Sequence, residues 1–353
     1  MESSKPKVLI TGITGFLGSQ VCKYFLEDGN YSVRGTVRNK NDERKMKPIQ
    51  HAFGENNFSK LELFEADLLN PESLDNAIQG CDYVVHTASP LPAIVPKDEN
   101  VLIRPAVEGT LSILRSCVKH KIKRIVITSS SLTMCVQPSN KKPVYNEEDW
   151  SDPNSCAPYD KSKTLAERAA WDFHSQLSDQ EKFELVVINP AFIQGPALVQ
   201  TDFSSGIVVR KIMNGDIPGA PKVMFPVVDV RDVALAHLRA IQVKEAANHR
   251  FILSDRSMWF KEMAQVLAQK YPSGFKINTS DIKYCTLKFA SWFDASAKTL
   301  LPFWGLEFEM DNQKSKTILG IQYRPASEAV IEMAESLIQS GLLRSKKKTQ
   351  CSS

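Results

Sequence analysis

The segment TGITGFLG, residues 11–18, is the part of the sequence from which the fold is most readily inferred. It follows the apolar run KVLIT, residues 7–11, and it leads directly into an amphipathic segment. In such a context Gly12 permits a sharp exit from a strand, Gly15 lets the backbone approach a pyrophosphate, and Gly18 lets the helix pack against the sheet. Free N–H groups at the start of the helix then face the anion. The spacing predicts a dinucleotide-binding turn, with a turn that binds nothing as the alternative.

Short apolar runs and amphipathic runs alternate downstream of this turn. This alternation is typical of right-handed crossovers between parallel strands that helices cover on both faces. We expect strands at residues 7–11, 31–37, 61–68, 82–88, 124–131 and 183–190, with a weak strand at 250–254. We expect helices at 16–30, at 73–80 with Ser73 as N-cap, and at 100–120, 157–173, 230–241, 258–270 and 326–340.

The fold class predicted from this pattern is α/β, a Rossmann-type doubly wound parallel sheet with a smaller C-terminal substrate lobe. The regular rhythm ends after Pro190, where the sequence becomes rich in Pro and Gly. We therefore assign residues 1–190 to an NADP-binding domain and 191–340 mainly to the substrate lobe, with part of 225–255 returning to the first domain. The basic end, 341–353, is expected to be disordered.

Composition narrows the classes of function. The 353 residues carry a net charge of +4 from 44 basic and 40 acidic side chains, interleaved along the chain, which favours neither a nucleic-acid nor a membrane partner. The start is polar and no long apolar stretch is present, so we expect a cytoplasmic protein. The seven cysteines form no CxxC pair and no metal-ligand spacing, so we expect free thiols, no disulfides and no structural metal.

The end of the second expected strand indicates which nucleotide binds. An acidic residue there would bind the ribose 2′-OH of NAD, whereas a basic residue pairs with the 2′-phosphate of NADP. The sequence VRGTVRNKNDERKMK places Arg38 at the strand end and Lys45 on the next turn. A guanidinium binds phosphate through two parallel donors, so NADP is the predicted cofactor. The alternative is that Arg38 lies on a solvated loop.

Two later strand ends fit the rest of a nucleotide. Asp67 and Leu68 follow the third strand, where an adenine would lie, and the small residues Thr87, Ala88 and Ser89 end the fourth, where a ribose would lie against the sheet. His86 is interpreted as a packed strand residue rather than a catalytic one.

The sequence YDKSK, residues 159–163, begins the helix expected at 157–173. An offset of four places Tyr159 and Lys163 on one face, so the ammonium is expected to lower the phenol pKa from about 10 towards the range useful for general acid catalysis. Ser130 lies in TSSSLTM, at the carboxyl end of the fifth strand, where ligands bind in parallel sheets. Ser130 would stabilise a carbonyl oxygen while hydride from a nicotinamide attacks the carbon and Tyr159 delivers the proton.

Taken together, the motifs TGITGFLG, VRGTVR, DLLNPESL, GCDYVVHTASP, ITSSS, YDKSKTLAERAAW and INPAFIQGP resemble the extended short-chain dehydrogenase/reductases, and among them the dihydroflavonol reductase and cinnamoyl-CoA reductase group. The resemblance runs from about Lys7 to the final helix. It implies Ser130, Tyr159 and Lys163 as the catalytic set. It also implies the nucleotide contacts Gly12, Thr14, Gly15, Phe16, Leu17, Arg38, Lys45, Asp67, Leu68, Thr87, Ala88, Ser89, Tyr159, Lys163, Pro190 and Ile193.

The segments expected to line the substrate site are mostly apolar. Besides Ser130, the candidate substrate contacts are Met134, Cys135, Phe203, Ile207, Met224 and Phe225. Cys135 stands where flavonoid reductases carry an asparagine, a departure that counts against a flavonoid or phenylpropanoid-CoA substrate. An apolar lining favours a hydrophobic aldehyde or ketone over a phosphorylated sugar. The alternative is that these side chains fill the core.

The function expected from these features is NADPH-dependent reduction of an apolar or aromatic aldehyde or ketone to the alcohol, by a monomer or homodimer. A hydroxysteroid dehydrogenase or a nucleotide-sugar epimerase or dehydratase of the same superfamily is the alternative enzyme. A non-catalytic regulator that senses NADP is the alternative of another class.

Overall fold

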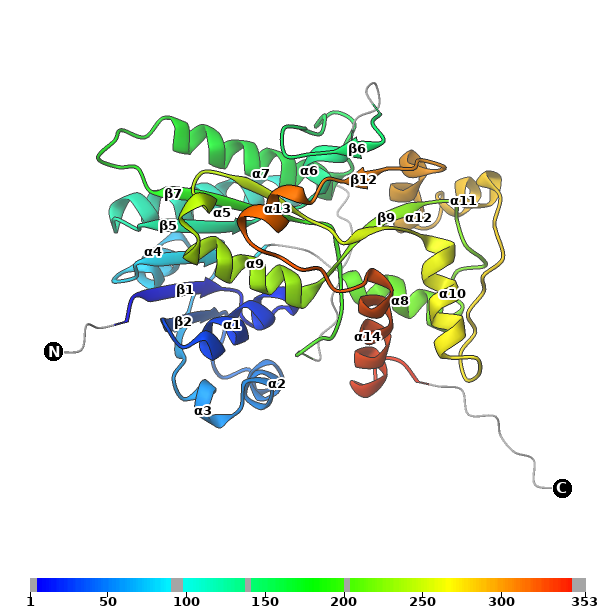
Figure 1. Ribbon diagram of the computed structural model, residues 1–353, viewed down its shortest axis with the longest axis horizontal. Helices are drawn as coiled ribbons and strands as arrows, with labels where there is room; N and C mark the ends of the chain where they lie inside the picture. Colours follow the sequence, from blue (N-terminus) through cyan, green and yellow to red (C-terminus); the bar gives the residue numbers. More distant parts are fainter. Residues whose placement is uncertain (1–4, 90–97, 137–140, 200–203, 345–353) are drawn as a thin grey trace.

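The computed structural model describes residues 5–89, 98–136, 141–199 and 204–344. Its large sheet has seven strands, all parallel, in the order β10-β7-β5-β4-β1-β2-β3 (Figure 1). Their bounds are β1 Lys7–Thr11, β2 Ser32–Val37, β3 Glu62–Glu65, β4 Tyr83–His86, β5 Arg124–Thr128, β7 Glu184–Pro190 and β10 Arg250–Leu253. The predicted Rossmann-type fold is confirmed. The strand order reverses between β1 and β4, and this reversal opens a crevice at their carboxyl ends.

Alternate residues of the strands face two separate cores, as the two-residue period of a strand requires. Val8, Val126 and Val186 face α1 (Phe16–Asp28) and α9 (Val230–Gln242). Their neighbours on the opposite face of the same strands pack against α4 (Pro71–Ile78), α5 (Asn100–Lys119) and α7 (Pro158–Ser175). Because helices cover both faces, the central strands β1, β4, β5 and β7 are mostly apolar.

Residues after β7 build a smaller lobe around a third core. A three-stranded sheet in the order β11-β9-β8 comprises β8 (Phe192–Gln194), β9 (Met224–Asp229) and β11 (Arg256–Trp259). The helices α8 (Ser204–Asn214), α10 (Phe260–Lys270) and α14 (Ala326–Gln339) lie together on the side away from the large sheet (Figure 1). The segment 225–255 contributes β9 to the small sheet and β10 to the large one.

The remaining elements are short. They are α2 (Glu43–Phe53), α3 (Glu55–Phe58), α6 (Leu132–Cys135), α11 (Tyr284–Ala290), α12 (Ala295–Leu300) and α13 (Gln313–Ile318), the 3-10 turns η1 (Lys244–Ala246) and η2 (Leu301–Phe303), and the paired strands β6 (Val144–Tyr145) and β12 (Glu309–Met310).

Two helix starts differ from the sequence-based expectation. Asn70, not Ser73, caps α4, because Pro71 occupies the first helical turn and the Asn70 side chain accepts a hydrogen bond from the Ser73 amide. The helix expected at 258–270 begins at Phe260, because residues 256–259 pair antiparallel with β9. The last part of the expected tail, 345–353, lies outside the described residues.

In the described part of the chain, no helix combines the length and the apolarity needed to cross a membrane. Within the same residues, no group of three or more His, Cys, Asp or Glu side chains is arranged to hold a metal ion. The six described cysteines, Cys22, Cys81, Cys117, Cys135, Cys156 and Cys285, are free thiols.

Candidate active site

The glycine-rich turn joins β1 to α1 and lies against the end of β4. Gly12 has a φ of 74°, and the Gly15 amide donates to the Gly12 carbonyl at 3.0 Å. A Cβ added at Gly18 would lie 2.2 Å from the Gly12 oxygen and 2.8 Å from Thr87 Oγ1. Only glycine therefore allows the helix to start this close to the turn. A tight turn followed at once by a helix is the arrangement that binds a pyrophosphate.

The side chains expected at the 2′-phosphate lie just beyond β2. Arg38 directly follows the last residue of β2 and is exposed, and Lys45 is half-buried in α2, a helix that the sequence pattern did not indicate. Past β3, Asp67 is exposed, and its carboxylate accepts a hydrogen bond from the Leu69 amide. Contact of Arg38 and Lys45 with a nucleotide stays a prediction.

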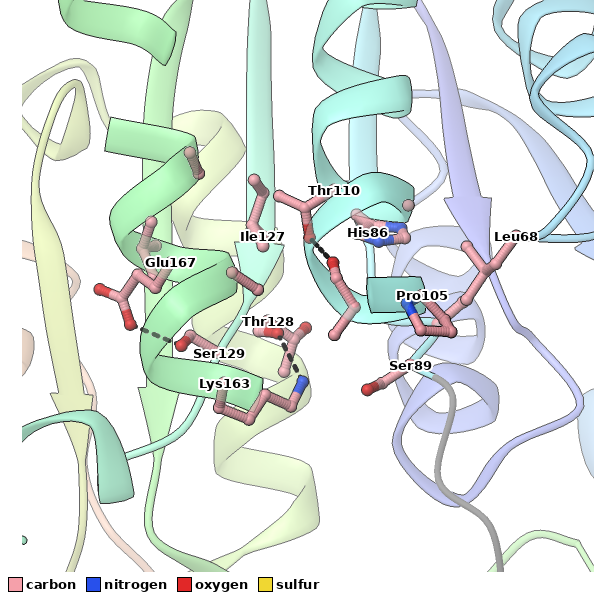
Figure 2. Close-up of a pocket in the computed structure, with 16 residues that line it drawn as sticks. Leu68, His86, Ser89, Pro105, Thr110, Ile127, Thr128, Ser129, Lys163 and Glu167 are labelled. Carbon is pink, nitrogen blue, oxygen red and sulfur yellow. Dashed lines mark hydrogen bonds between the residues drawn. The ribbon is translucent and has the colours of Figure 1, made fainter. Parts of the chain in front are cut away.

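A cavity lies between α5 and α7, at the carboxyl ends of β4 and β5 (Figure 2). Four of the expected nucleotide contacts, Leu68, Ala88, Ser89 and Lys163, line it together with Thr128. The cavity therefore lies at the carboxyl edge of the sheet, the edge that also carries the glycine-rich turn, next to the crevice where the strand order reverses. It is on the face covered by α5 and α7, whereas α1 covers the opposite face.

The proposed catalytic side chains come from two elements that meet beside this cavity. Ser130 follows β5 and is buried, with its Oγ accepting a hydrogen bond from the Leu132 amide at 3.2 Å. Tyr159 and Lys163 lie in the first two turns of α7, and the Lys163 ammonium donates to the carbonyl of Thr128, the last residue of β5, at 3.4 Å (Figure 2). The helix with the phenol and the ammonium is thereby held against the strand end with the serine.

Burial, not the neighbouring ammonium, sets the pKa of Tyr159. Burial and then the Asp160 carboxylate raise the Tyr159 pKa to about 12, which is opposite to the lowering expected from the sequence. Burial also lowers the pKa of Lys163 to about 8, against the opposing effect of Glu167. The Tyr159 phenol is therefore protonated at neutral pH and available as a proton donor. The Lys163 ammonium titrates slightly above neutral pH.

His86 is placed as a structural residue. It is buried in β4, where burial lowers its pKa to about 3, and its Nδ1 lies 2.9 Å from the Thr11 hydroxyl. The imidazole is therefore neutral at physiological pH and serves the packing between β1 and β4.

The expected substrate contacts are spread over both lobes. Met134 and Cys135 are buried in a cluster with Tyr145, Ile252, Phe308 and Met310, so in this structure both side chains pack in the core. Ile207 lies in α8 and is half-buried, as are Met224 and Phe225 in β9. Phe203 lies outside the described residues. Contact of these side chains with a substrate stays a prediction.

Two further expected nucleotide contacts lie at the junction of the lobes. Pro190 ends β7 and is buried, and Ile193 is half-buried in β8. The Pro190 carbonyl accepts a hydrogen bond from the Ser131 amide at 2.9 Å. This bond joins the end of β7 to residues 129–131 after β5, here called the serine turn.

Comparison with known proteins places the chain in a family. Residues 8–253 match the model of the NAD dependent epimerase/dehydratase family. The chain belongs to this family. Tetraketide alpha-pyrone reductase 1 of Arabidopsis thaliana is 33% identical to it, over 97% of this chain and 98% of the relative. Cinnamoyl-CoA reductase 1 of Petunia hybrida is 33% identical, over 95% of this chain and 93% of the relative.

This member of the epimerase/dehydratase family is also similar to a solved structure of a reductase. A yeast methylglyoxal/isovaleraldehyde reductase complexed with NADPH has a TM-score of 0.76 and 28% identity, over 96% of this chain and 100% of that chain. The resemblance to the cinnamoyl-CoA reductase group inferred from the motifs is confirmed by these comparisons.

Three buried polar residues behind the site were not predicted from the sequence. Asn189 in β7 and Arg250 in β10 both donate hydrogen bonds to Glu167 in α7, which also accepts one from Ser129. Two features of the sequence could have indicated two of them. Asn189 is a polar residue in the motif INPAFIQGP, and Glu167 follows Lys163 by four residues, on the same face of the helix.

Proposed function

We propose that this protein reduces an aldehyde or ketone to the alcohol, with hydride from NADPH and a proton from Tyr159. The observation that carries the proposal is the contact between Lys163 and the end of β5, which brings Tyr159 and Lys163 to the strand end that carries Ser130. The named reductases among the relatives, one of them solved with NADPH, support the same reaction class.

The residues present fit a dinucleotide. A Cβ at Gly18 would collide with the Gly12 carbonyl oxygen and with Thr87, so glycine lets α1 begin close to the turn, as a pyrophosphate-binding turn requires. Arg38 and Lys45 offer two cations beyond β2 for a 2′-phosphate. Leu68, Ala88 and Ser89 would accept the adenosine and ribose parts. When bound, NADPH supplies the hydride that adds to the carbonyl carbon.

The chain's own groups act on the oxygen of the substrate. The Ser130 hydroxyl donates a hydrogen bond to this oxygen as negative charge develops on it. Tyr159, which burial keeps protonated at neutral pH, transfers its proton to the same oxygen. The Lys163 ammonium stabilises the phenolate that remains and hydrogen-bonds the nicotinamide ribose.

We infer an apolar or aromatic substrate. Ile207, Met224 and Phe225 are half-buried apolar side chains of the small lobe, and the Phe225 ring lies 5.4 Å from that of Phe192. The relatives named above are reductases of a pyrone, a cinnamoyl thioester and small aldehydes, which supports a carbonyl compound over a sugar nucleotide.

A panel of carbonyl compounds tests the proposal. Purified protein is mixed with NADPH and with aliphatic and aromatic aldehydes and ketones, steroid ketones and sugar nucleotides, and the loss of NADPH absorbance is followed. We expect turnover with apolar aldehydes or ketones. Turnover only with a steroid or a sugar nucleotide would replace the proposed substrate class. Tight NADPH binding with no turnover at all would favour a sensor of NADP.

A further inference from the structure

A carboxylate is buried behind the proposed catalytic groups. Glu167 lies in α7, four residues after Lys163, and its side chain is 1% exposed. An ionised group at such a position is costly unless other groups compensate its charge and fill its hydrogen-bonding capacity. The partners of Glu167 therefore show what the carboxylate organises.

One carboxylate oxygen holds the serine turn and β7. Glu167 Oε2 accepts hydrogen bonds from Ser129 Oγ at 2.5 Å and from Asn189 Nδ2 at 2.7 Å. The first of these contacts is visible beside Lys163 in Figure 2. Ser129 immediately precedes Ser130, so the carboxylate fixes the backbone from which the proposed oxyanion donor projects.

Asn189 extends this contact to Ser130 itself. Its Nδ2 lies 3.2 Å from the Ser130 carbonyl and 3.2 Å from Thr133 Oγ1, whose hydroxyl donates to the same carbonyl at 2.8 Å. The Asn189 Oδ1 atom is buried, and among the described residues it has no hydrogen-bond partner. An unpaired buried acceptor lowers stability. The orientation of the Asn189 amide is therefore explained by the hydrogen bonds that its Nδ2 donates.

The other carboxylate oxygen is paired with Arg250 of β10. The Arg250 Nε lies 2.5 Å from Glu167 Oε1, and its Nη2 lies 3.1 Å from Thr133 Oγ1. The guanidinium also lies 3.8 Å from the centre of the Trp150 ring and donates to two backbone carbonyls, those of Glu147 and Asp149. The charge of Glu167 is thus neutralised by a group that is itself fixed from four sides.

We propose that Glu167, held by Arg250 and Asn189, is a positioning residue that sets the Ser130 turn against the helix of Tyr159 and Lys163. This inference rests on the proposed function. A buried ion pair contributes little to stability compared with apolar residues of the same volume, whereas the same pair fixes relative orientation through directional bonds. Here those bonds join α7, the serine turn, β7 and β10 at one point.

A double-mutant cycle tests whether Glu167 acts through Ser130. Glu167→Gln, Ser130→Ala and the double variant are compared with the wild type for kcat, KM and NADPH dissociation constant. We expect Glu167→Gln to lower kcat about tenfold or more, because displaced catalytic groups lose rate steeply, with NADPH affinity within about twofold. In the Ser130→Ala background the same change should lower kcat by less than about twofold.

Two further variants keep the result interpretable. Glu184→Gln breaks a second arginine–glutamate pair, Arg124–Glu184 at 2.6 Å, at the opposite end of β5 and β7, and should leave kcat unchanged. If Glu167→Gln does not fold, Ser129→Ala removes one bond to the carboxylate without leaving Arg250 unpaired. It should lower kcat about threefold in the wild type and not in Ser130→Ala.

The outcomes separate this inference from the proposed function. Turnover by the wild type together with additive losses in the cycle would overturn the positioning role alone. Equal losses of kcat in Glu167→Gln and Glu184→Gln would also overturn it, since both would then be effects of general destabilisation. Absence of turnover with every carbonyl tested would overturn the proposed function and this inference with it.

Discussion

Lys163 and Tyr159 lie one helical turn apart, and burial moves their pKa values in opposite directions. The phenol pKa is raised to about 12 and the ammonium pKa is lowered to about 8. A phenol that keeps its proton at neutral pH is a ready donor, but it becomes acidic enough only when positive charge stabilises the phenolate. In the proposed mechanism, proton transfer therefore depends on the charge of Lys163.

The rate of carbonyl reduction should consequently fall at alkaline pH. Below about pH 8 Lys163 carries its charge, and as the pH rises through about 8 the ammonium is lost while Tyr159 remains protonated. Glu167 on the same helix opposes the effect of burial and raises the Lys163 pKa. His86 on β4, whose own pKa is lowered by burial and then by Lys163, is neutral throughout this range. The measurement is kcat for NADPH oxidation between pH 6 and 10, and a flat profile to pH 10 would contradict this role.

Arg38 should decide between the two nicotinamide cofactors. Arg38→Asp replaces an exposed cation beyond β2 with a group that repels a 2′-phosphate and accepts hydrogen bonds from a ribose 2′-OH. We expect the NADPH dissociation constant to rise at least tenfold, because a charge-assisted bond of roughly 1.5–3 kcal/mol is lost, with NADH binding unchanged or improved. Cofactor fluorescence titrations measure both constants. Equal weakening of NADPH and NADH would show that Arg38 does not contact the phosphate.

The residues that could be named from the sequence are those whose chemistry is local. Tyr159 and Lys163 are neighbours on one helix, and Arg38 follows a strand that its own apolar pattern reveals. Glu167 and Arg250 are 83 residues apart, and their contact exists only because β10 returns to the sheet beside β7. The direction of the Tyr159 pKa was also beyond the sequence, since burial depends on packing around α7.

At the scale of elements, the start of α1 depends on the close approach of Gly18 to the preceding turn. Gly18→Ala would place a methyl group 2.2 Å from the Gly12 carbonyl oxygen, so α1 must move away from the turn. We expect the NADPH dissociation constant to rise at least tenfold, because the amides at the helix start no longer converge on the pyrophosphate.

Gly29→Ala is the matched control at the other end of the same helix. Gly29 has a φ of 72° as the C-cap of α1, so alanine costs about 1 kcal/mol of stability there without disturbing the turn. Thermal unfolding and NADPH titration of both variants separate the effects. If both variants lose NADPH affinity equally, general destabilisation rather than the turn is responsible.

Most elements with a clear period were predicted, but the eleven-residue helices α2 and α8 and the shortest elements were not. The strands of the large sheet and helices such as α5 and α9 follow apolar patterns that match their structures. The two-residue strands β6 and β12 and the four-residue helix α6 are too short to show any period. Pairing of β11 with β9 moved the start of α10, a long-range contact that no local pattern records.

At the scale of the whole molecule, the C-terminal segment is tied to the large sheet through α9. Asp232 in α9 is fully buried and pairs with the Arg324 guanidinium, and it accepts a further hydrogen bond from the Arg324 amide at 2.7 Å. Arg231 of the same helix pairs with Glu332 of α14. These contacts hold α14, and with it the core of the small lobe, in a fixed place relative to the nucleotide-binding sheet.

Removal of Arg324 should therefore destabilise the whole molecule. Arg324→Ala leaves the buried Asp232 carboxylate with its amide contact but no cation, and we expect a loss of about 2 kcal/mol in the free energy of unfolding at pH 7. The figure is below that for fully buried pairs because Arg324 is 39% exposed. Urea unfolding measures it. Lys47→Ala, which breaks the exposed pair with Glu43, is the control and should change stability by less than about 0.5 kcal/mol.

The proposed proton transfer from Tyr159 is tested most directly with the variant Tyr159→Phe. NADPH oxidation by the variant is followed in a single turnover with a carbonyl substrate of the wild type. The variant should bind NADPH with an affinity within about twofold of the wild type and oxidise it at least 100-fold more slowly, within the range that positioned proton donors supply. Oxidation of NADPH by the variant at the wild-type rate would show that the proton comes from another group and would contradict the proposed mechanism.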